Sequence, residues 1–261
     1  DRHQPFSFGL WFRIEKPGTS GPFVTRSGGI MNGQRGYEVM LRPDGTFTAG
    51  LHHVAPDNSL EIETTKPVKA HEWHHLALTY DGSSRAAGVR LFIDGQLAAT
   101  RVLMDRLQQS LIYDRTNGSW GAPPPLRIGK RQDETLQDVS VDEFRVYDRQ
   151  LTQFEAAYLG GASPDLGGKD PLGAVLAIPS ASRTPAQQAA LREHYVLREE
   201  PAFTKPFDEL TWLRGQENDA LTSLTEVMVM RDRVTPRPTF VLARGAYDAP
   251  GETVTPGTPK S

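Results

Sequence analysis

The chain has 261 residues, enough for one sizeable core and a smaller appendage. Its net charge of −3 comes from mixed charges without a basic stripe, which argues against nucleic acid as a partner, and no apolar run approaches the roughly 18 residues that span a bilayer. The absence of cysteine excludes a disulfide framework, a thiol nucleophile, Cys-ligated zinc and covalent haem.

The first part of the chain consists of short alternating segments separated by turn residues. Residues 6–14, Phe-Ser-Phe-Gly-Leu-Trp-Phe-Arg-Ile, place an apolar residue at every second position, which predicts a strand with one buried face. Residues 37–41 and 47–51 flank the Asp-Gly turn at 44–45 and predict a hairpin. Further strands are expected at 73–80, 89–93, 96–100, 126–129 and 139–147. This pattern predicts an all-β sandwich or barrel and excludes a parallel α/β fold.

After residue 147 the pattern becomes helical. Thr152, with Glu155 three positions later, predicts the N-cap of a short helix that Gly160 ends. Residues 161–183 are rich in Gly, Pro and Ser, and we expect them to form a linker.

Two helices are expected next, over residues 184–230. The first begins at Thr184-Pro185, with Thr184 as the cap, and should run to about Glu200. The second follows Pro206. The short connection predicts an antiparallel hairpin. Residues 231–261 contain frequent Pro and Gly and predict an extended tail, in which only 239–243 has strand character.

Four segments then occur in a familiar order. They are Phe6-Ser7-Phe8-Gly9-Leu10-Trp11-Phe12, Trp73-His74-His75-Leu76-Ala77-Leu78-Thr79-Tyr80-Asp81-Gly82, Leu91-Phe92-Ile93-Asp94-Gly95 and Asp142-Glu143-Phe144-Arg145-Val146-Tyr147. Together they resemble the concanavalin-A-like, laminin-G-like jelly-roll family. The resemblance implies a jelly-roll sandwich over residues 1–160, acting as a non-catalytic module that binds a glycan or a protein through its rim loops. Members of this family have one more strand before the first segment, so we expect the chain to be part of a longer protein.

The C-terminal part is similar to a narrower group. The segments Asp170-Pro171-Leu172, Ala177-Ile178-Pro179, Arg183-Thr184-Pro185 and 237–245 resemble the large planctomycete-type cytochrome-associated proteins. In these, a laminin-G-like domain lies between two domains of unknown function, often downstream of a haem domain. The resemblance implies export to the periplasm or cell surface and neighbouring domains as partners, with the tail as the start of a downstream domain. An alternative function is therefore that of a structural spacer between haem-associated and downstream domains.

The segment His71-Glu72-Trp73-His74-His75 matches the H-E-x-x-H pattern of zinc proteases. That chemistry needs a helix, so that both histidines reach one metal. Here Leu76, Leu78 and Tyr80 alternate, so the segment enters a strand. At about 3.3 Å per residue the two histidines would be roughly 13 Å apart. We therefore interpret the segment as a tryptophan that anchors a core strand, flanked by surface histidines.

Asp142 is the candidate metal ligand. By alternation it shares a strand face with Phe144 and Val146, so we expect it to point inward, where a carboxylate needs a hydrogen bond, a charged partner or a metal. Laminin-G-like domains often hold calcium at the sandwich rim, and the resemblance makes Asp142 a candidate ligand. Calcium needs six or more oxygen ligands, and no complete set is evident, so a structural hydrogen bond is the alternative. No other cofactor is expected.

Catalysis is the remaining alternative, because some sandwiches of this type are glycoside hydrolases. These need two carboxylates about 5–10 Å apart across a groove. Asp142 and Glu143 are adjacent and would point to opposite faces, and no strand carries three alternating acids. We therefore expect no catalytic residues.

Two aromatic residues are candidates for glycan binding. Sugar-binding sites generally stack an aromatic ring on the sugar. Trp120 lies in the polar loop 118–125, and Tyr113 precedes this loop. Exposure of these rings at the rim would favour a binding module over a spacer.

Overall fold

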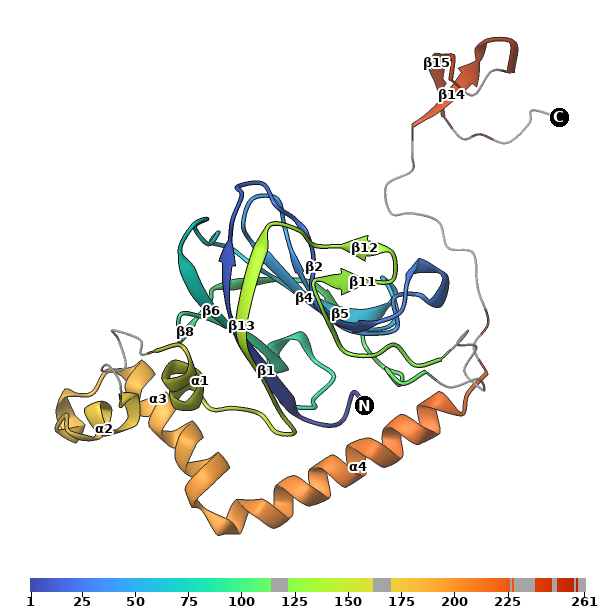
Figure 1. Cartoon of the computed structure of the whole chain (residues 1–261). Helices are drawn as coiled ribbons and strands as arrows, with labels where there is room; N and C mark the ends of the chain where they lie inside the picture. The colour runs from blue at the N-terminus through green and yellow to red at the C-terminus, as the bar shows by residue number, and fades with distance from the viewer. Residues whose placement is uncertain are drawn as a thin grey trace. The chain divides into compact units, whose positions relative to one another are not determined.

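The computed structural model describes residues 1–113, 122–161, 170–225, 227, 238–245, 248–255 and 257. Two antiparallel sheets form a sandwich (Figure 1). The five-stranded sheet has the order β13-β1-β6-β7-β8, formed by β1 (Phe6–Ile14), β6 (Trp73–Tyr80), β7 (Val89–Ile93), β8 (Gln96–Leu97) and β13 (Val139–Tyr147). The six-stranded sheet has the order β10-β2-β3-β4-β5-β9, formed by β2 (Gly21–Ser27), β3 (Gly36–Leu41), β4 (Phe47–Val54), β5 (Asn58–Thr64), β9 (Thr100–Asp105) and β10 (Arg127–Ile128).

The core lies between the sheets and follows from the alternation of each strand. Phe8, Leu10 and Phe12 of β1 are buried. The Phe12 ring meets those of Phe23 and Phe47 edge-on, with centroids 5.1 and 5.4 Å apart. Edge-to-face contacts of this kind add to the free energy gained from burial. The predicted all-β sandwich is confirmed.

The structure also shows strands that the sequence did not predict. The segment 96–100 divides, because β8 ends at Leu97 and β9 begins at Thr100 in the other sheet. β2 and β5 were not predicted. The alternation of β2 is broken by the register shift between Pro22 and Val24, whereas in β5 Leu60 and Ile62 do alternate with polar residues.

Three helices form a small second core. α1 (Gln153–Leu159) begins with the predicted capping box, in which Thr152 and Glu155 bond each other's backbone N–H. Part of the predicted linker is also a helix, α2 (Pro171–Leu176), whose cap is Asp170. α3 (Pro185–His194) begins at the predicted Thr184 cap. Apolar side chains from all three pack together, namely Phe154, Ala157, Val175 and Ala190.

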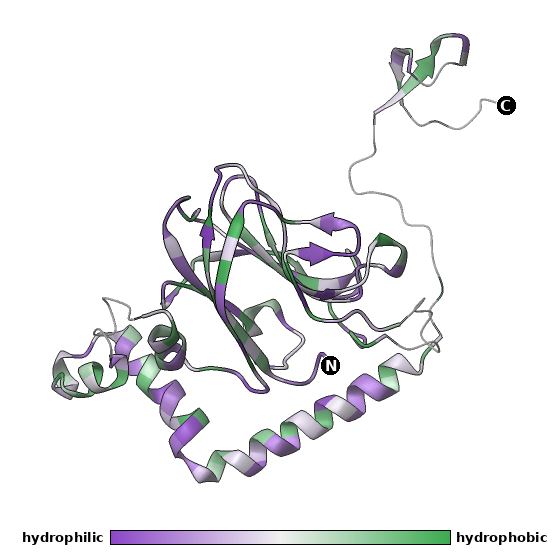
Figure 2. Cartoon of the chain, in the orientation of Figure 1, coloured by the Kyte–Doolittle hydropathy of each residue, from purple (hydrophilic) through white to green (hydrophobic). Residues whose placement is uncertain are grey.

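α4 (Thr204–Thr222) packs on the N-terminal segment. Buried Asn218 accepts a hydrogen bond from Arg2 Nε at 2.9 Å, and its amide donates to the Asp1 carboxylate at 2.9 Å. Arg214 donates to the Asp81 carbonyl at 3.2 Å. The two longer helices are present, but the predicted antiparallel packing is not, because α3 packs on α1 while α4 diverges from it (Figure 1). Hydrophilic and hydrophobic residues are interspersed along α4 (Figure 2), and its Phe207, Leu210 and Leu213 stay exposed and do not pack on α3.

Residues 225–261 form a separate compact unit. Their described part contains a two-stranded antiparallel sheet, β14 (Thr239–Leu242) and β15 (Pro250–Val254). No helix in the described parts of the chain has the length and apolar character needed to cross a membrane.

Candidate functional site

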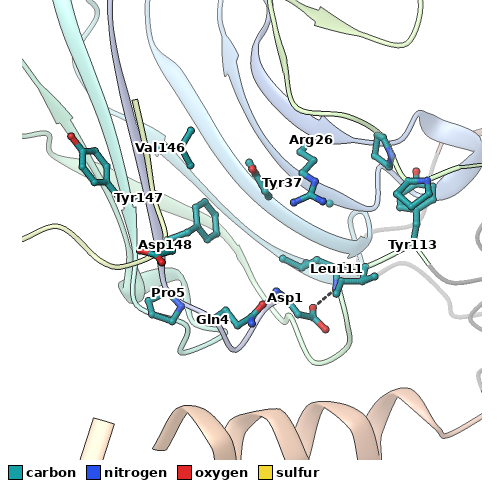
Figure 3. Close-up of a pocket in the computed structure, with 15 residues that line it drawn as sticks. Asp1, Gln4, Pro5, Arg26, Tyr37, Leu111, Tyr113, Val146, Tyr147 and Asp148 are labelled. Atoms are coloured by element: carbon teal, nitrogen blue, oxygen red, sulfur yellow. Dashed lines mark hydrogen bonds between the residues drawn. The ribbon is translucent and has the colours of Figure 1, made fainter. Parts of the chain in front are cut away.

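A cleft of about 510 Å³ opens at the edge of the sandwich, where the N-terminal residues, β2, β3 and the end of β13 meet (Figure 3). We call it the edge cleft. Its walls combine aromatic rings, prolines and a few charged groups. Its lining residues include Phe6, Arg26, Tyr37, Tyr113, Tyr147 and Asp148.

Aromatic rings on β1 and β3 form one wall of the edge cleft. The rings of Phe6 and Tyr37 are 4.8 Å apart, and Phe6 also contacts the buried Tyr80 at 5.5 Å. This packing holds Phe6 and Tyr37 in place before any ligand arrives. The cleft therefore has a rigid apolar wall, which reduces the entropy lost on binding.

Arg26 supplies the positive charge of the edge cleft. It lies on β2 opposite Tyr37 of β3 and is exposed. Figure 3 shows both side chains inside the cleft, between Tyr113 and the Tyr147–Asp148 end. Burial raises the pKa of Tyr37, and the Arg26 guanidinium beside it acts in the opposite direction. Tyr37 is therefore a neutral hydroxyl that can donate and accept hydrogen bonds.

Tyr113 is held by close packing against a glycine. A Cβ atom added to Gly28 would lie 1.3 Å from the Tyr113 hydroxyl, with the Asn32 side chain also within 3.1 Å. Burial raises the pKa of Tyr113. The segment before Tyr113 is held by Asp1, whose carboxylate accepts hydrogen bonds from Leu111 N–H at 2.8 Å and the Ser110 hydroxyl at 2.7 Å.

The structure thus brings Tyr113 into a cleft, together with residues that the sequence did not single out. Arg26, Tyr37 and Phe6 come from three strands, and no local motif marks them as binding residues. Trp120, the other aromatic candidate, lies outside the described residues.

Asp142 does not point inward, contrary to the prediction. The pairing of β1 with β13 places Gly9 opposite Arg145 but Trp11 opposite Asp142, so the register shifts between them. Glu143 has a φ of 50° at this bulge. One extra residue reverses the faces that follow it.

The consequence is that Asp142 is exposed and accepts a hydrogen bond from Glu143 N–H at 2.7 Å. Among the described residues no group of three or more His, Asp or Glu side chains is placed to hold a metal ion. Calcium binding by Asp142 stays a prediction.

The H-E-x-x-H segment lies in a strand from Trp73 onward, as predicted, but its side chains are distributed differently. Trp73 is 44% exposed and carries the Arg13 guanidinium over its ring at 5.3 Å. His74 and His75 are buried. His74 lies 2.7 Å from the Asp94 carboxylate, whereas His75 packs edge-on against Trp11 at 5.4 Å. The interpretation of a buried tryptophan between surface histidines is therefore wrong for these three residues.

A buried polar network covers part of the outer face of the six-stranded sheet. Arg131, in the hairpin of β11 (Lys130–Arg131) and β12 (Glu134–Thr135), donates to both oxygens of Glu38 at 2.8 and 2.9 Å. Glu38 and Glu61 both lie opposite Gly50 in the sheet. Burial, and then the charge of Glu38, raise the pKa of Glu61. The alternation of Glu61 and Glu63 was the sequence signal for this network.

The sequence comparison identifies the family. Residues 1–157 match the model Laminin_G_3, described as the concanavalin A-like lectin/glucanases superfamily, and this range is more than half of the chain. The chain belongs to this superfamily. The resemblance to a laminin-G-like, concanavalin-A-like domain is thereby confirmed. A search of curated proteins gave no match.

Solved structures similar to this concanavalin A-like chain include binding proteins. A heptameric pentraxin from Limulus polyphemus is 15% identical, with a TM-score of 0.40 over 60% of this chain and 70% of the pentraxin. The CBM40 of a Ruminococcus gnavus sialidase, solved with sialyllactose, is 15% identical, with a TM-score of 0.46 over 60% and 83%. A Bacteroides ovatus protein described as a putative carbohydrate-binding protein is 13% identical, with a TM-score of 0.40 over 64% and 44%.

Proposed function

We propose that the chain is a non-catalytic glycan-binding module and that the edge cleft is its binding site. The observation that carries the proposal is the combination, in one cleft, of Tyr37, Tyr113 and Phe6 with Arg26 and Asp148. Ligand sites are typically concave and mostly apolar, with a few polar groups that orient the ligand. A sugar offers an apolar ring face and hydroxyl groups, which match these two kinds of side chain. Membership of a superfamily that includes lectins supports the same proposal.

The binding test uses the full 261-residue chain on a glycan array, followed by calorimetry with the glycan that gives the strongest signal. Tyr113→Ala removes one ring, and Gly28→Ala adds a methyl group where the Tyr113 hydroxyl lies. We expect each to weaken binding roughly tenfold, as for a truncated central contact. Trp212→Ala is the control, since Trp212 is 61% exposed on α4 and outside the edge cleft. Absence of glycan binding, or binding that both cleft variants leave intact, would refute the proposal.

Hydrolysis is tested separately, because the superfamily also contains glucanases. Glu38 and Glu61 are the carboxylates to examine, and Glu38 is already bonded to Arg131 and to the Ser27 hydroxyl at 2.6 Å. We expect the bound glycan to be recovered unchanged by chromatography after long incubation. Shortened products that disappear with Glu61→Gln would replace the binding role with an enzymatic one.

We also propose that the module works inside a larger exported protein, beside haem-associated and downstream domains. Support comes from the resemblance of residues 170–185 and 237–245 to cytochrome-associated proteins. A spacer role is the alternative, and the attachment of α4 to the sandwich through Asn218 favours it, because such attachment fixes the direction in which the chain leaves the domain. Fractionation of the source cells with an antibody to this chain tests the location, and cytoplasmic recovery would contradict it.

A further inference from the structure

A second cleft, of about 360 Å³, lies between the end of β13 and helices α1 and α2. We call it the helix cleft, and Arg145, Tyr147, Arg149, Phe154, Tyr158 and Asp170 are the lining residues that matter here. It lies on the outer face of the five-stranded sheet, because Phe144 and Val146 alternate with Arg145 and Tyr147 and Phe144 packs on the core.

Aromatic side chains form the apolar part of the helix cleft. Phe154 is buried beneath it, and its ring meets that of His194 edge-on at 5.7 Å. Tyr158 of α1 borders the helix cleft and is 66% exposed, so a ligand in the cleft can reach its ring. Tyr147 contributes a second tyrosine from β13 and lies under the Arg149 guanidinium at 5.7 Å. Tyrosines that keep one exposed face can stack on the apolar face of a sugar ring.

The charged groups of the helix cleft are held by nearby side-chain and backbone partners. Arg149 donates to Glu155 at 3.0 Å, and Glu155 also accepts from Arg198 and from the Thr152 backbone. Burial would raise the pKa of Glu155, but these partners outweigh it and hold the pKa below its ordinary value. Asp170 caps α2 by accepting from Gly173 N–H at 3.0 Å.

The lining charges therefore cancel. Two arginines, Arg145 and Arg149, line the helix cleft together with two carboxylates, Glu155 and Asp170. One more charge of each sign lies beside them, because Arg145 bonds Glu143 and Glu155 bonds Arg198. A ligand with net charge would be attracted by one pair and repelled by the other, so its charge would add little to the free energy of binding. A neutral ligand with many hydroxyl groups can use both kinds of group, since hydroxyls donate and accept hydrogen bonds.

Segment 145–149 separates the two clefts. Val146 and Asp148 border the edge cleft, while Arg145 and Arg149 border the helix cleft, and Tyr147 borders both. In Figure 3 the Tyr147 ring points away from Arg26 and Tyr37. A chain-like ligand that crosses this edge of the sheet would contact both clefts.

We infer that the helix cleft is a second subsite for the same glycan, so that the preferred ligand is a neutral oligosaccharide chain and not a single sugar. This inference rests on the proposed function. It makes α1 part of the binding surface. Joining two weak subsites by one ligand raises the affinity well above that of either subsite alone.

The test is NMR titration of the full ¹⁵N-labelled chain with neutral cello-, xylo- and manno-oligosaccharides of one to six sugars. Amide shifts report each cleft independently, at Arg26 and Tyr37 for the edge cleft and at Arg149 and Tyr158 for the helix cleft. We expect short sugars to shift the first pair only and longer chains to shift both pairs. Tyr158→Ala should weaken hexasaccharide binding roughly tenfold and change disaccharide binding by less than about twofold. Trp212→Ala is the matched control, because it also removes one exposed aromatic ring.

The outcomes separate the two proposals. Shifts confined to the edge cleft at every length, or an affinity that does not depend on length, would overturn the second subsite and leave the proposed function intact. Shifts confined to the helix cleft would overturn both the idea that one ligand contacts both clefts and the assignment of the edge cleft as the binding site. No shift at either cleft with any of these sugars would overturn the neutral oligosaccharide ligand, and the glycan array would then decide the proposed function by itself. Equal weakening by Trp212→Ala would show that the effect of Tyr158→Ala is not local and would also overturn the inference.

Discussion

Trp73 and His75 show how the two faces of one strand acquire different environments. Leu76, Leu78 and Tyr80 point into the core, so the odd positions 73 and 75 lie on the outer face of the sheet. Trp73 stays partly exposed at the beginning of β6. His75 is buried by Trp11 on the neighbouring strand, in a sheet whose outer face α1 also covers at Ala77 and Phe92. Position along the strand therefore decides the burial of these two side chains.

Replacement of Trp73 should cost little stability. We expect Trp73→Ala to lower the free energy of unfolding by less than about 1 kcal/mol, because the ring is partly exposed and lies under the Arg13 guanidinium outside the core. Phe12→Ala is the comparison, and a fully buried aromatic should cost about 3–5 kcal/mol. Urea denaturation measures both. A Trp73→Ala cost equal to that of Phe12→Ala would show that the ring belongs to the core.

His75 should make stability depend on pH. Burial lowers its pKa to about 4, although Asp94 acts in the opposite direction. The unfolded chain, with an ordinary histidine pKa near 6.5, therefore binds more protons than the folded chain between about pH 4 and 6.5. The free energy of unfolding should fall as the pH falls through this range, by about 2 kcal/mol from this group between pH 7 and pH 5.

The measurement compares urea denaturation at pH 7 and pH 5 for the wild type and His75→Gln. The variant should lose less stability between the two pH values. His71→Gln, in the exposed turn before β6, should behave as the wild type. His74 acts in the opposite sense, since the Asp94 hydrogen bond raises its pKa, and its contribution is present at low pH and is lost as the pH rises through that raised pKa. An unchanged pH dependence in His75→Gln would contradict this assignment.

At the scale of elements, α4 is fixed by polar contacts more than by apolar packing. Asn218 is 3% exposed, whereas Phe207, Leu210 and Leu213 are between 38 and 50% exposed. The buried Arg2 side chain also donates to the Ser84 hydroxyl at 2.7 Å and lies 3.7 Å from Glu217. Most of the stability of a helix in a protein comes from its tertiary contacts, so these contacts stabilise α4 where it lies.

Asn218→Ala should release α4. The change removes the acceptor for Arg2 Nε and leaves a buried charged group less well satisfied, which costs on the order of 1–3 kcal/mol. Hydrogen exchange of the amides in 204–222 should speed up while β1 and β6 stay protected. Glu209→Ala, an exposed position on the same helix, is the control. Equal protection of α4 in both variants would mean that other contacts hold the helix.

The whole chain consists of two compact units, residues 1–224 and 225–261. We therefore expect trypsin to cut after Arg231 before it cuts within the sandwich, because the boundary between the units precedes this residue. The product that ends at Arg231 should melt within about 2 °C of the intact chain. A change of 1 kcal/mol in the free energy of unfolding shifts the melting temperature of a domain this size by roughly 2–4 °C, so this limit corresponds to a loss of less than about 1 kcal/mol. Mass spectrometry identifies the cut and calorimetry measures the melting. A much lower melting temperature would show that residues after 231 stabilise the sandwich.

The sequence by itself determined the sandwich, its β1 and β6 strands, and the caps at Thr152 and Thr184. These features depend on local alternation and on side chains that bond their own backbone, so residues close in the sequence specify them. The bulge at Glu143 and the packing of α4 on the sandwich were decided only in the tertiary structure, because each depends on residues more than a hundred positions away. Both clefts were also decided only in the tertiary structure, because their lining residues lie on separate elements: Arg26, Tyr37 and Tyr113 in one cleft, and Tyr147 and Tyr158 in the other. Periodicity shows which face of a strand is buried, but only strand register and helix packing decide what lies opposite that face.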